Sequence, residues 1–353
     1  YVTIGGGFTN IIGFNSGYST IAGGGCNDIG SNSSYATIGG GFDNSVGNNS
    51  GYSTIAGGYQ NGIGTNAFGS FLGSGEANQI GNGSSVSVIG GGSGNAVGDD
   101  SSAATIAGGS VNKVGAHAPN AAIGGGSVNS VADYGQSATI AGGANNAIGS
   151  NSAFSAVVGG QQNIVAADNS AASIVGGWGN SIGTNSDYSA VGGGQDNAIS
   201  NQAPYAAIPG GRQNVVASGA TNALVAGRQA KANHAGAFVW GDDRASEVAS
   251  TNANSVTFRA AGGYRLFSNA GLTLGAQLAP NATAWSALSD RNAKENFEPI
   301  NTAEVLDRVA ALPLTAWTYK HDPEHRRYIG PVAQDFHAAF SLGNDTTINT
   351  LDA

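Results

Sequence analysis

A serine and a lysine five positions apart form the strongest chemical motif in this sequence. Ser289 opens the segment SDRNAKENFEPI, and Lys294 is its lysine. A serine hydroxyl becomes a nucleophile when a base lies nearby, and a lysine amine can be that base when burial lowers its pKa. Taken alone, the segment is better explained as a polar turn ahead of a helix, so a catalytic interpretation depends on the residues around it.

Other residue patterns that carry chemistry are missing from the sequence. The histidines show no metal-ligand spacing, and Pro323 separates His321 from His325 on what would be one helix face. Gly-Gly-Gly segments recur throughout residues 1–227, but the phosphate-binding pattern G-x-x-x-x-G-K-[ST] is absent. Aspartate does not repeat in the turns as a calcium-binding β-roll requires. We therefore expect no metal and no cofactor.

The charged residues argue against several classes of partner. The net charge is −9, and residues 1–227 carry nine acids against only Lys113 and Arg212. Nucleic acid is not expected to bind, because phosphate recognition needs clustered Lys and Arg. A polysaccharide depolymerase usually needs paired carboxylates, and the acids of residues 1–227 form no cluster. No apolar run approaches the roughly 20 residues that span a bilayer.

The elements that must position any site repeat every 17 residues. Asparagine recurs at this interval through thirteen repeats without an insertion, with an aliphatic residue six positions before it and Ile or Val two positions after it. Such a fixed period is the signature of a solenoid. The asparagines are Asn10, Asn27, Asn44, Asn61, Asn78, Asn95, Asn112, Asn129, Asn146, Asn163, Asn180, Asn197 and Asn214.

Each repeat predicts two short strands that end at glycines. Period-two alternation places a small residue such as Ala36 and the aliphatic Ile38 on one inward face. Without insertions, the coils are expected to stack as two parallel sheets about 4.8 Å apart, giving a mainly β, parallel β-roll or β-helix solenoid roughly 60 Å long. The asparagines would then form a structural ladder of side-chain amides, each bonded to its own turn and to its neighbours.

The interior of one coil is predicted to be too thin to stand alone. Three copies side by side would supply the missing packing surface and shield the sheets. On these residues, the repeats from 1 to about 227 resemble the heads of trimeric autotransporter adhesins, which are parallel β-rolls built as trimers. The period of 17 is longer than is usual in those heads. Exposed aromatics, with Tyr18 and Trp178 as examples, are expected at a trimer seam.

The repeat fails after residue 227, and the sequence predicts two further domains. Residues 228–288 are expected to be a β-rich trimeric neck, with a hairpin over 255–267 and with Trp240 and Trp285 as packing anchors. Residues 289–353 are expected to be a small α+β domain. Asn301 is predicted to cap a helix that ends before Pro313, and residues 314–320 are predicted to form a strand.

Residues 289–353 resemble the endosialidase-type intramolecular chaperone domain found at the ends of phage tail spikes, tail fibres and many bacterial fibre proteins. The resemblance rests on SDRNAKENFEPI together with the downstream segments WTYK and RRYIGPVAQDF. It implies that the domain aligns three chains. The chain is expected to lack both a leader or anchor ahead of Tyr1 and the long helix that usually closes this domain.

The same resemblance implies a self-cleavage site. Ser289 matches the family's nucleophile and Lys294 its general base, with Asp290 in support and the cut between Leu288 and Ser289. Asn292-Ala293 departs from the commoner basic-aliphatic pair. Any enzyme activity is expected to be single-turnover autoproteolysis with no external substrate.

The sequence thus favours an extracellular, homotrimeric fibre, foremost a phage tail fibre that attaches to a host-surface glycan or protein receptor. A bacterial cell-surface adhesin or extracellular filament is the main alternative, and a polysaccharide depolymerase is a third. The expected location is a virion tail appendage or the bacterial surface. An N-terminal virion-docking domain would favour the phage tail fibre. A signal peptide with a membrane anchor would favour the bacterial adhesin.

Overall fold

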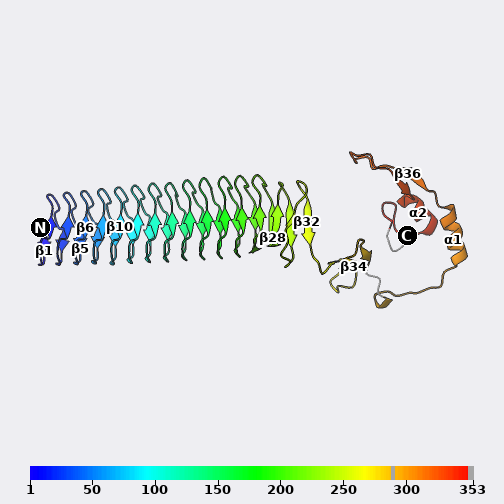
Figure 1. Ribbon diagram of the computed structural model, residues 1–353, viewed down its shortest axis with the longest axis horizontal. Helices are drawn as coiled ribbons and strands as arrows, with labels where there is room; N and C mark the ends of the chain where they lie inside the picture. The colour runs from blue at the N-terminus through cyan, green and yellow to red at the C-terminus, as the bar shows by residue number, and fades with distance from the viewer. Residues whose placement is uncertain (288–290, 349–353) are drawn as a thin grey trace. The chain divides into compact units, whose positions relative to one another are not determined.

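The computed structural model describes residues 1–287 and 291–348, which belong to two compact units, Tyr1–Arg259 and Ala260–Ala353. We call the first the solenoid and the second the C-terminal unit. Figure 1 shows the solenoid as a stack of similar coils, most of which contribute one strand to each of two sheets. Within the described residues, these parallel sheets contain 17 and 15 strands.

The strands of the solenoid are mostly two residues long. The first sheet contains β1 (Thr3–Ile4), β3 (Thr20–Ile21), β5 (Thr37–Ile38), β7 (Thr54–Ile55), β9 (Phe71–Leu72), β11 (Val88–Ile89), β13 (Thr105–Ile106), β15 (Ala122–Ile123), β17 (Thr139–Ile140), β19 (Ala156–Val157), β21 (Ser173–Ile174), β23 (Ala190–Val191), β25 (Ala207–Ile208), β26 (Gly211–Arg212), β28 (Leu224–Arg228), β30 (Phe238–Gly241) and β32 (Val256–Arg259). The second contains β2 (Ile11–Ile12), β4 (Asp28–Ile29), β6 (Ser45–Val46), β8 (Gly62–Ile63), β10 (Gln79–Ile80), β12 (Ala96–Val97), β14 (Lys113–Val114), β16 (Ser130–Val131), β18 (Ala147–Ile148), β20 (Ile164–Val165), β22 (Ser181–Ile182), β24 (Ala198–Ile199), β27 (Val215–Val216), β29 (Ala230–Ala232) and β31 (Val248–Ala249).

The coils stack in register at the predicted interval. Thr37 pairs with Thr54 and Ile38 with Ile55, and the same 17-residue offset runs through the repeats. Ile38 is fully buried, whereas its neighbour Thr37 is half-buried, because successive side chains of a strand point to opposite faces. The predicted parallel β-solenoid is therefore confirmed.

Each ladder asparagine uses its whole side-chain amide inside the stack. The Nδ2 group of Asn112 donates to Oδ1 of Asn95 at 3.1 Å and to the carbonyls of Gly108 and Gly126, both at 3.0 Å. Its Oδ1 accepts the backbone N–H of Asn129 at 3.0 Å. Since Asn112 is fully buried, these bonds replace those that water would otherwise supply.

A column of buried serines forms a second polar ladder, which sequence reasoning missed. Ser33 Oγ donates to the carbonyl of Gly47 at 2.8 Å and accepts the backbone N–H of Ser50 at 3.1 Å. Both serines are fully buried. The signal was present in the sequence, from Ser16 onward, as Ser, Ala or Gly six positions after every ladder asparagine except Asn163, where Asn169 takes this place.

The glycines before the asparagine mark the closest approach between coils. Gly24 and Gly41 have φ angles of +93° and +94°. A Cβ at Gly24 would collide with the carbonyl oxygen of Gly41 in the next coil. The position therefore requires glycine both for its backbone conformation and for the space.

One premise of the sequence analysis is wrong. The interior of a coil was expected to need neighbouring copies to shield it from water. In a single chain, the inward aliphatics Ile38, Ile55 and Ile106 are already 0% exposed, because the coils above and below cover them. Any trimer must therefore be held by the outer surface or by the C-terminal unit.

The solenoid continues past the point where the 17-residue period ends. Leu224 of β28 pairs with Phe238 of β30, and Phe238 pairs in parallel with Val256 of β32. The expected hairpin over 255–267 is wrong, because β33 (Tyr264–Phe267) pairs instead with β34 (Gly275–Leu278). Alternation of inward and outward side chains predicts a strand but not the strand that it pairs with.

The domain limits predicted at 227/228 and 288/289 stay predictions.

The C-terminal unit contains short strands and two α-helices among its described residues. β33, β34 and β35 (Ser286–Ala287) form an antiparallel sheet. The remaining elements are η1 (Arg291–Ala293), α1 (Thr302–Ala311), β36 (Thr315–Trp317), β37 (Tyr328–Gly330) and α2 (Ala333–Phe340).

Replacing Asn112 by alanine should destabilise the solenoid by at least about 3 kcal/mol, because buried donors and acceptors on three coils lose their partner at about 1–3 kcal/mol each. Thermal unfolding followed by circular dichroism measures the change. Lys113→Ala is the matched control, since Lys113 is an exposed neighbour on β14 and surface substitutions usually change stability by less than about 0.5 kcal/mol. Equal unfolding midpoints for the two variants would contradict the proposed contribution of the ladder to the stability of the solenoid.

Candidate functional site

The structure describes only part of the predicted self-cleavage motif. Leu288, Ser289 and Asp290 lie outside the described residues, so the pairing of Ser289 with Lys294 stays a prediction. The motif continues in η1, after which the backbone N–H of Lys294 donates to the carbonyl of Arg291 at 3.1 Å. The guanidinium of Arg291 lies 4.2 Å from the ring centroid of Phe297, a cation–π contact that orders this turn.

Helix α1 begins and ends where the sequence predicts. The Asn301 side chain accepts the backbone N–H groups of Ala303 at 3.2 Å and Glu304 at 3.4 Å, which caps the helix. The helix ends at Ala311, before Pro313, and the strand expected over 314–320 is present as β36. These predictions are confirmed because capping and proline effects are local.

Strands β36 and β37 form an antiparallel pair that carries an aromatic stack. The rings of Trp317 and Tyr328 lie 4.9 Å apart with an interplanar angle of 19°. In the loop between them, Asp322 accepts a hydrogen bond from Arg326 Nε at 3.0 Å, and this bond is the main reason why the pKa of Asp322 is lowered. The ion pair lies within the loop that joins β36 to β37.

An apolar groove lies between α1 and α2. It has a volume of about 730 Å³, and its apolar lining includes Val305, Val309, Phe336 and Phe340. Helix α1 contains no buried residue, and Val309 is 53% exposed. Sequence reasoning found the apolar pattern of α1 but did not predict α2, which starts at Ala333 without a side-chain cap.

The outer surface of the solenoid carries stacked aromatic rings. The centroids of Tyr18 and Tyr35 lie 5.0 Å apart, and those of Tyr35 and Tyr52 lie 4.8 Å apart. These side chains are 47–57% exposed. The in-register coils place residues 17 positions apart directly above each other, so a sequence column becomes a surface strip.

The described residues contain neither a candidate metal site nor a candidate membrane-spanning helix. Across residues 1–287 and 291–348, no group of three or more His, Cys, Asp or Glu side chains could hold a metal ion. In the same part of the chain, no helix is long and apolar enough to cross a membrane.

If the motif cleaves the chain, Ser289→Ala should remain whole while the unmodified protein splits between Leu288 and Ser289, because the substitution removes the predicted nucleophile. Intact-mass spectrometry after purification measures both products. Ser286→Ala, a nearby serine on β35, is the control and should split like the unmodified chain. Identical masses for the unmodified chain and Ser289→Ala would refute the self-cleaving role.

Comparison with known families identifies the C-terminal segment. Residues 289–342 match the family described as Chaperone of endosialidase. A comparison with curated proteins found no match for the chain. The chain therefore has a chaperone-of-endosialidase domain at its C-terminal end, and together with its β-solenoid of 17-residue coils it fits a trimeric fibre protein with β-roll repeats.

Proposed function

We propose that this protein is a homotrimeric phage tail fibre that works outside the cell and attaches the virion to a host surface. In this proposal the solenoid is a stiff spacer whose outer face contacts the host. The C-terminal domain aligns three chains during assembly. The observation that carries the proposal is the presence, in one chain, of a continuous β-solenoid and a chaperone-of-endosialidase domain.

The physical properties of the solenoid suit a spacer. The coils of the 17-residue repeat are joined by both sheets and by the asparagine ladder, so bending would break hydrogen bonds on several columns at once. The ladder sites are occupied by buried, fully bonded side chains, which leaves the outer columns as the positions available for recognition.

The apolar groove of the C-terminal unit supports assembly through this unit. Phe336 is the one buried hydrophobic side chain of the unit within the part of the chain that the structure describes. An exposed apolar groove on so small a core is typical of a surface that packs against another chain. We propose that a second copy of this chain covers the groove formed by α1 and α2.

Val309→Glu should reduce or abolish the trimer, because a carboxylate in a closed apolar interface is costly to desolvate. Light scattering coupled to size-exclusion chromatography would give the number of chains per particle. A denaturing gel with and without boiling reports whether the assembly persists. Asp307→Ala, on the same helix, should leave the trimer intact. A monomeric unmodified chain would overturn the proposed assembly, and an unaffected Val309→Glu trimer would remove the groove from it.

A bacterial surface adhesin is the second candidate, because the solenoid is a parallel β-roll like the adhesin heads that its repeats resemble. Immunogold labelling of virions and of bacteria with an antibody against the solenoid separates the two. We expect label on the tails of virions. Label on uninfected bacteria, with none on virions, would favour the adhesin.

A further inference from the structure

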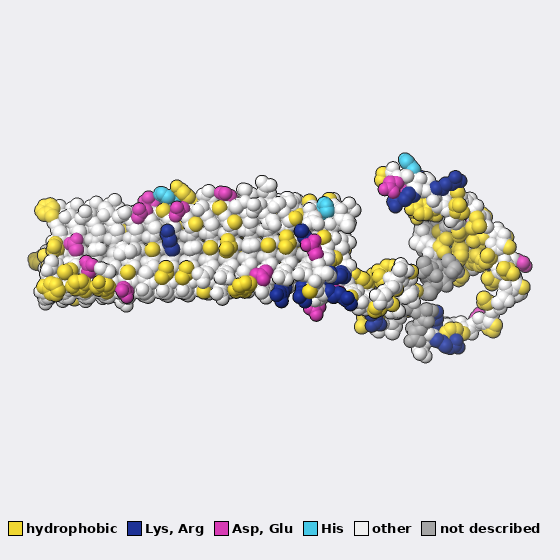
Figure 2. Space-filling view, in the orientation of Figure 1, with side chains coloured by type: hydrophobic (Ala, Val, Ile, Leu, Met, Phe, Trp, Pro, Cys, Tyr) yellow, Lys and Arg dark blue, Asp and Glu magenta, His cyan; other side chains and the backbone are white. Residues whose placement is uncertain are grey.

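The end of the solenoid nearest the C-terminal unit in sequence differs in charge from the rest. Residues 1–211 contain nine acidic side chains and Lys113 as their one base, whereas residues 212–259 contain five basic and three acidic side chains. Figure 2 shows these Lys and Arg side chains gathered at one end of the stack. An acidic fibre therefore carries one region with a net positive charge.

Four residues at this end form a single surface column, which we call the arginine strip: Trp178, Gln195, Arg212 and Arg228. Trp178 is bridged to Gln195, Gln195 to Arg212, and Arg212 pairs with Arg228 on the neighbouring strand. Residues paired in register on parallel strands project from the same side of the sheet. The strip therefore presents an exposed indole ring, an amide and two guanidinium groups in succession, about 4.8 Å apart along the stack.

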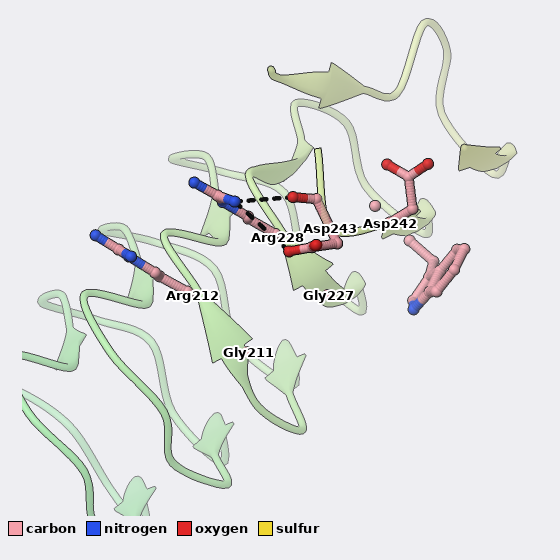
Figure 3. A pocket seen from close by; sticks show the side chains of 8 residues that line it. Gly211, Arg212, Gly227, Arg228, Asp242 and Asp243 are labelled. Carbon is pink, nitrogen blue, oxygen red and sulfur yellow. Dashed lines mark hydrogen bonds and ion pairs between the residues drawn. The ribbon is translucent and has the colours of Figure 1, made fainter. Parts of the chain in front are cut away.

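The two arginines border an open hollow of about 430 Å³. Its wall includes Trp240, which is 37% exposed. Glycines at three successive coils leave the floor without side chains. Figure 3 shows the Arg212 and Arg228 side chains extending side by side, while the Asp242 carboxylate lies away from them.

Of the two arginines, only Arg228 has an acidic partner within the described part of the chain. Asp242 accepts a bond from Arg259 Nε at 2.7 Å. Arg228 donates one bond to the backbone carbonyl of Asp243 at 2.8 Å and lies 3.6 Å from its exposed carboxylate. Within residues 1–287 and 291–348, no hydrogen bond or ion pair is formed by the Arg212 side chain.

Arg228 also has one buried donor that is not used. The Nε atom of Arg228 is buried and has no hydrogen-bond partner among the described residues. Two adjacent like charges raise the free energy of the empty site. A bound anion would relieve the charge repulsion, and a planar carboxylate fits the fork of a guanidinium group.

We propose that the arginine strip and its hollow bind a carboxylate-bearing polysaccharide. The carboxylate would be held by Arg212 and Arg228, and the indole rings of Trp178 and Trp240 would lie against sugar rings. The exposed tryptophans favour an acidic sugar over a simple anion, which would make no use of an aromatic ring. This inference rests on the proposed attachment function and names the ligand class that one part of the solenoid recognises.

The test measures binding of the purified full chain to oligosaccharides of polygalacturonate, hyaluronate and alginate by isothermal titration calorimetry, with dextran as the neutral probe. We expect at least one acidic probe to bind and dextran not to bind. Arg212→Gln should weaken that binding about tenfold or more, since a hydrogen bond to a charged group contributes about 1.5–3 kcal/mol. Trp178→Ala should also weaken it.

Arg244→Gln is the matched control, because it removes a positive charge from the same end of the solenoid without altering the hollow. It should bind like the unmodified chain. Binding to none of the acidic probes, equal binding to dextran, or an equal loss in Arg244→Gln would overturn the proposed site. Gold label on virion tails together with any of these results would leave the attachment function standing and remove only this site.

Discussion

The buried asparagine ladder is the interaction on which the solenoid depends. The amide of Asn112, for example, bonds to a carbonyl four residues earlier in its own coil, to a carbonyl of the next coil and to the asparagine of the coil before. These three bonds fix the shape of the turn and the offset between coils together. An insertion within a coil would move the amide off its partners, which explains why thirteen repeats keep the same length.

The fixed 17-residue offset between coils also determines which outer side chains lie next to each other. Because each outer residue lies directly above one in the preceding coil, a single column can become an aromatic stack or a cationic strip without any change to the interior. Tyr18, Tyr35 and Tyr52 illustrate the first case, and Arg212 with Arg228 the second. The scaffold and its outer surface are therefore largely independent of each other.

The two units reach stability by different means. The solenoid completes its core within one chain, since its inward aliphatics are fully buried by the coils above and below. The C-terminal unit leaves most of the apolar side chains of α1 and α2 accessible. A unit that is incomplete alone is well suited to assembly, because its folding is favoured when other copies are present.

The sequence by itself determined the solenoid, its 17-residue register, the limits of α1 and the chaperone motif. Periodicity and capping are local patterns, and Asn10 through Asn214 or Asn301 can be recognised without knowing what they contact. Only the tertiary structure decided that one chain closes its own core, that β32 extends the parallel sheet while β33 turns to β34, and that Arg212 and Arg228 adjoin one hollow with Trp240. Alternation identifies a strand but not its partner. Arg212 and Arg228 are 16 residues apart, so the 17-residue period does not place them in one column. Their pairing on neighbouring strands does, because contacts between distant residues depend on how the backbone stacks.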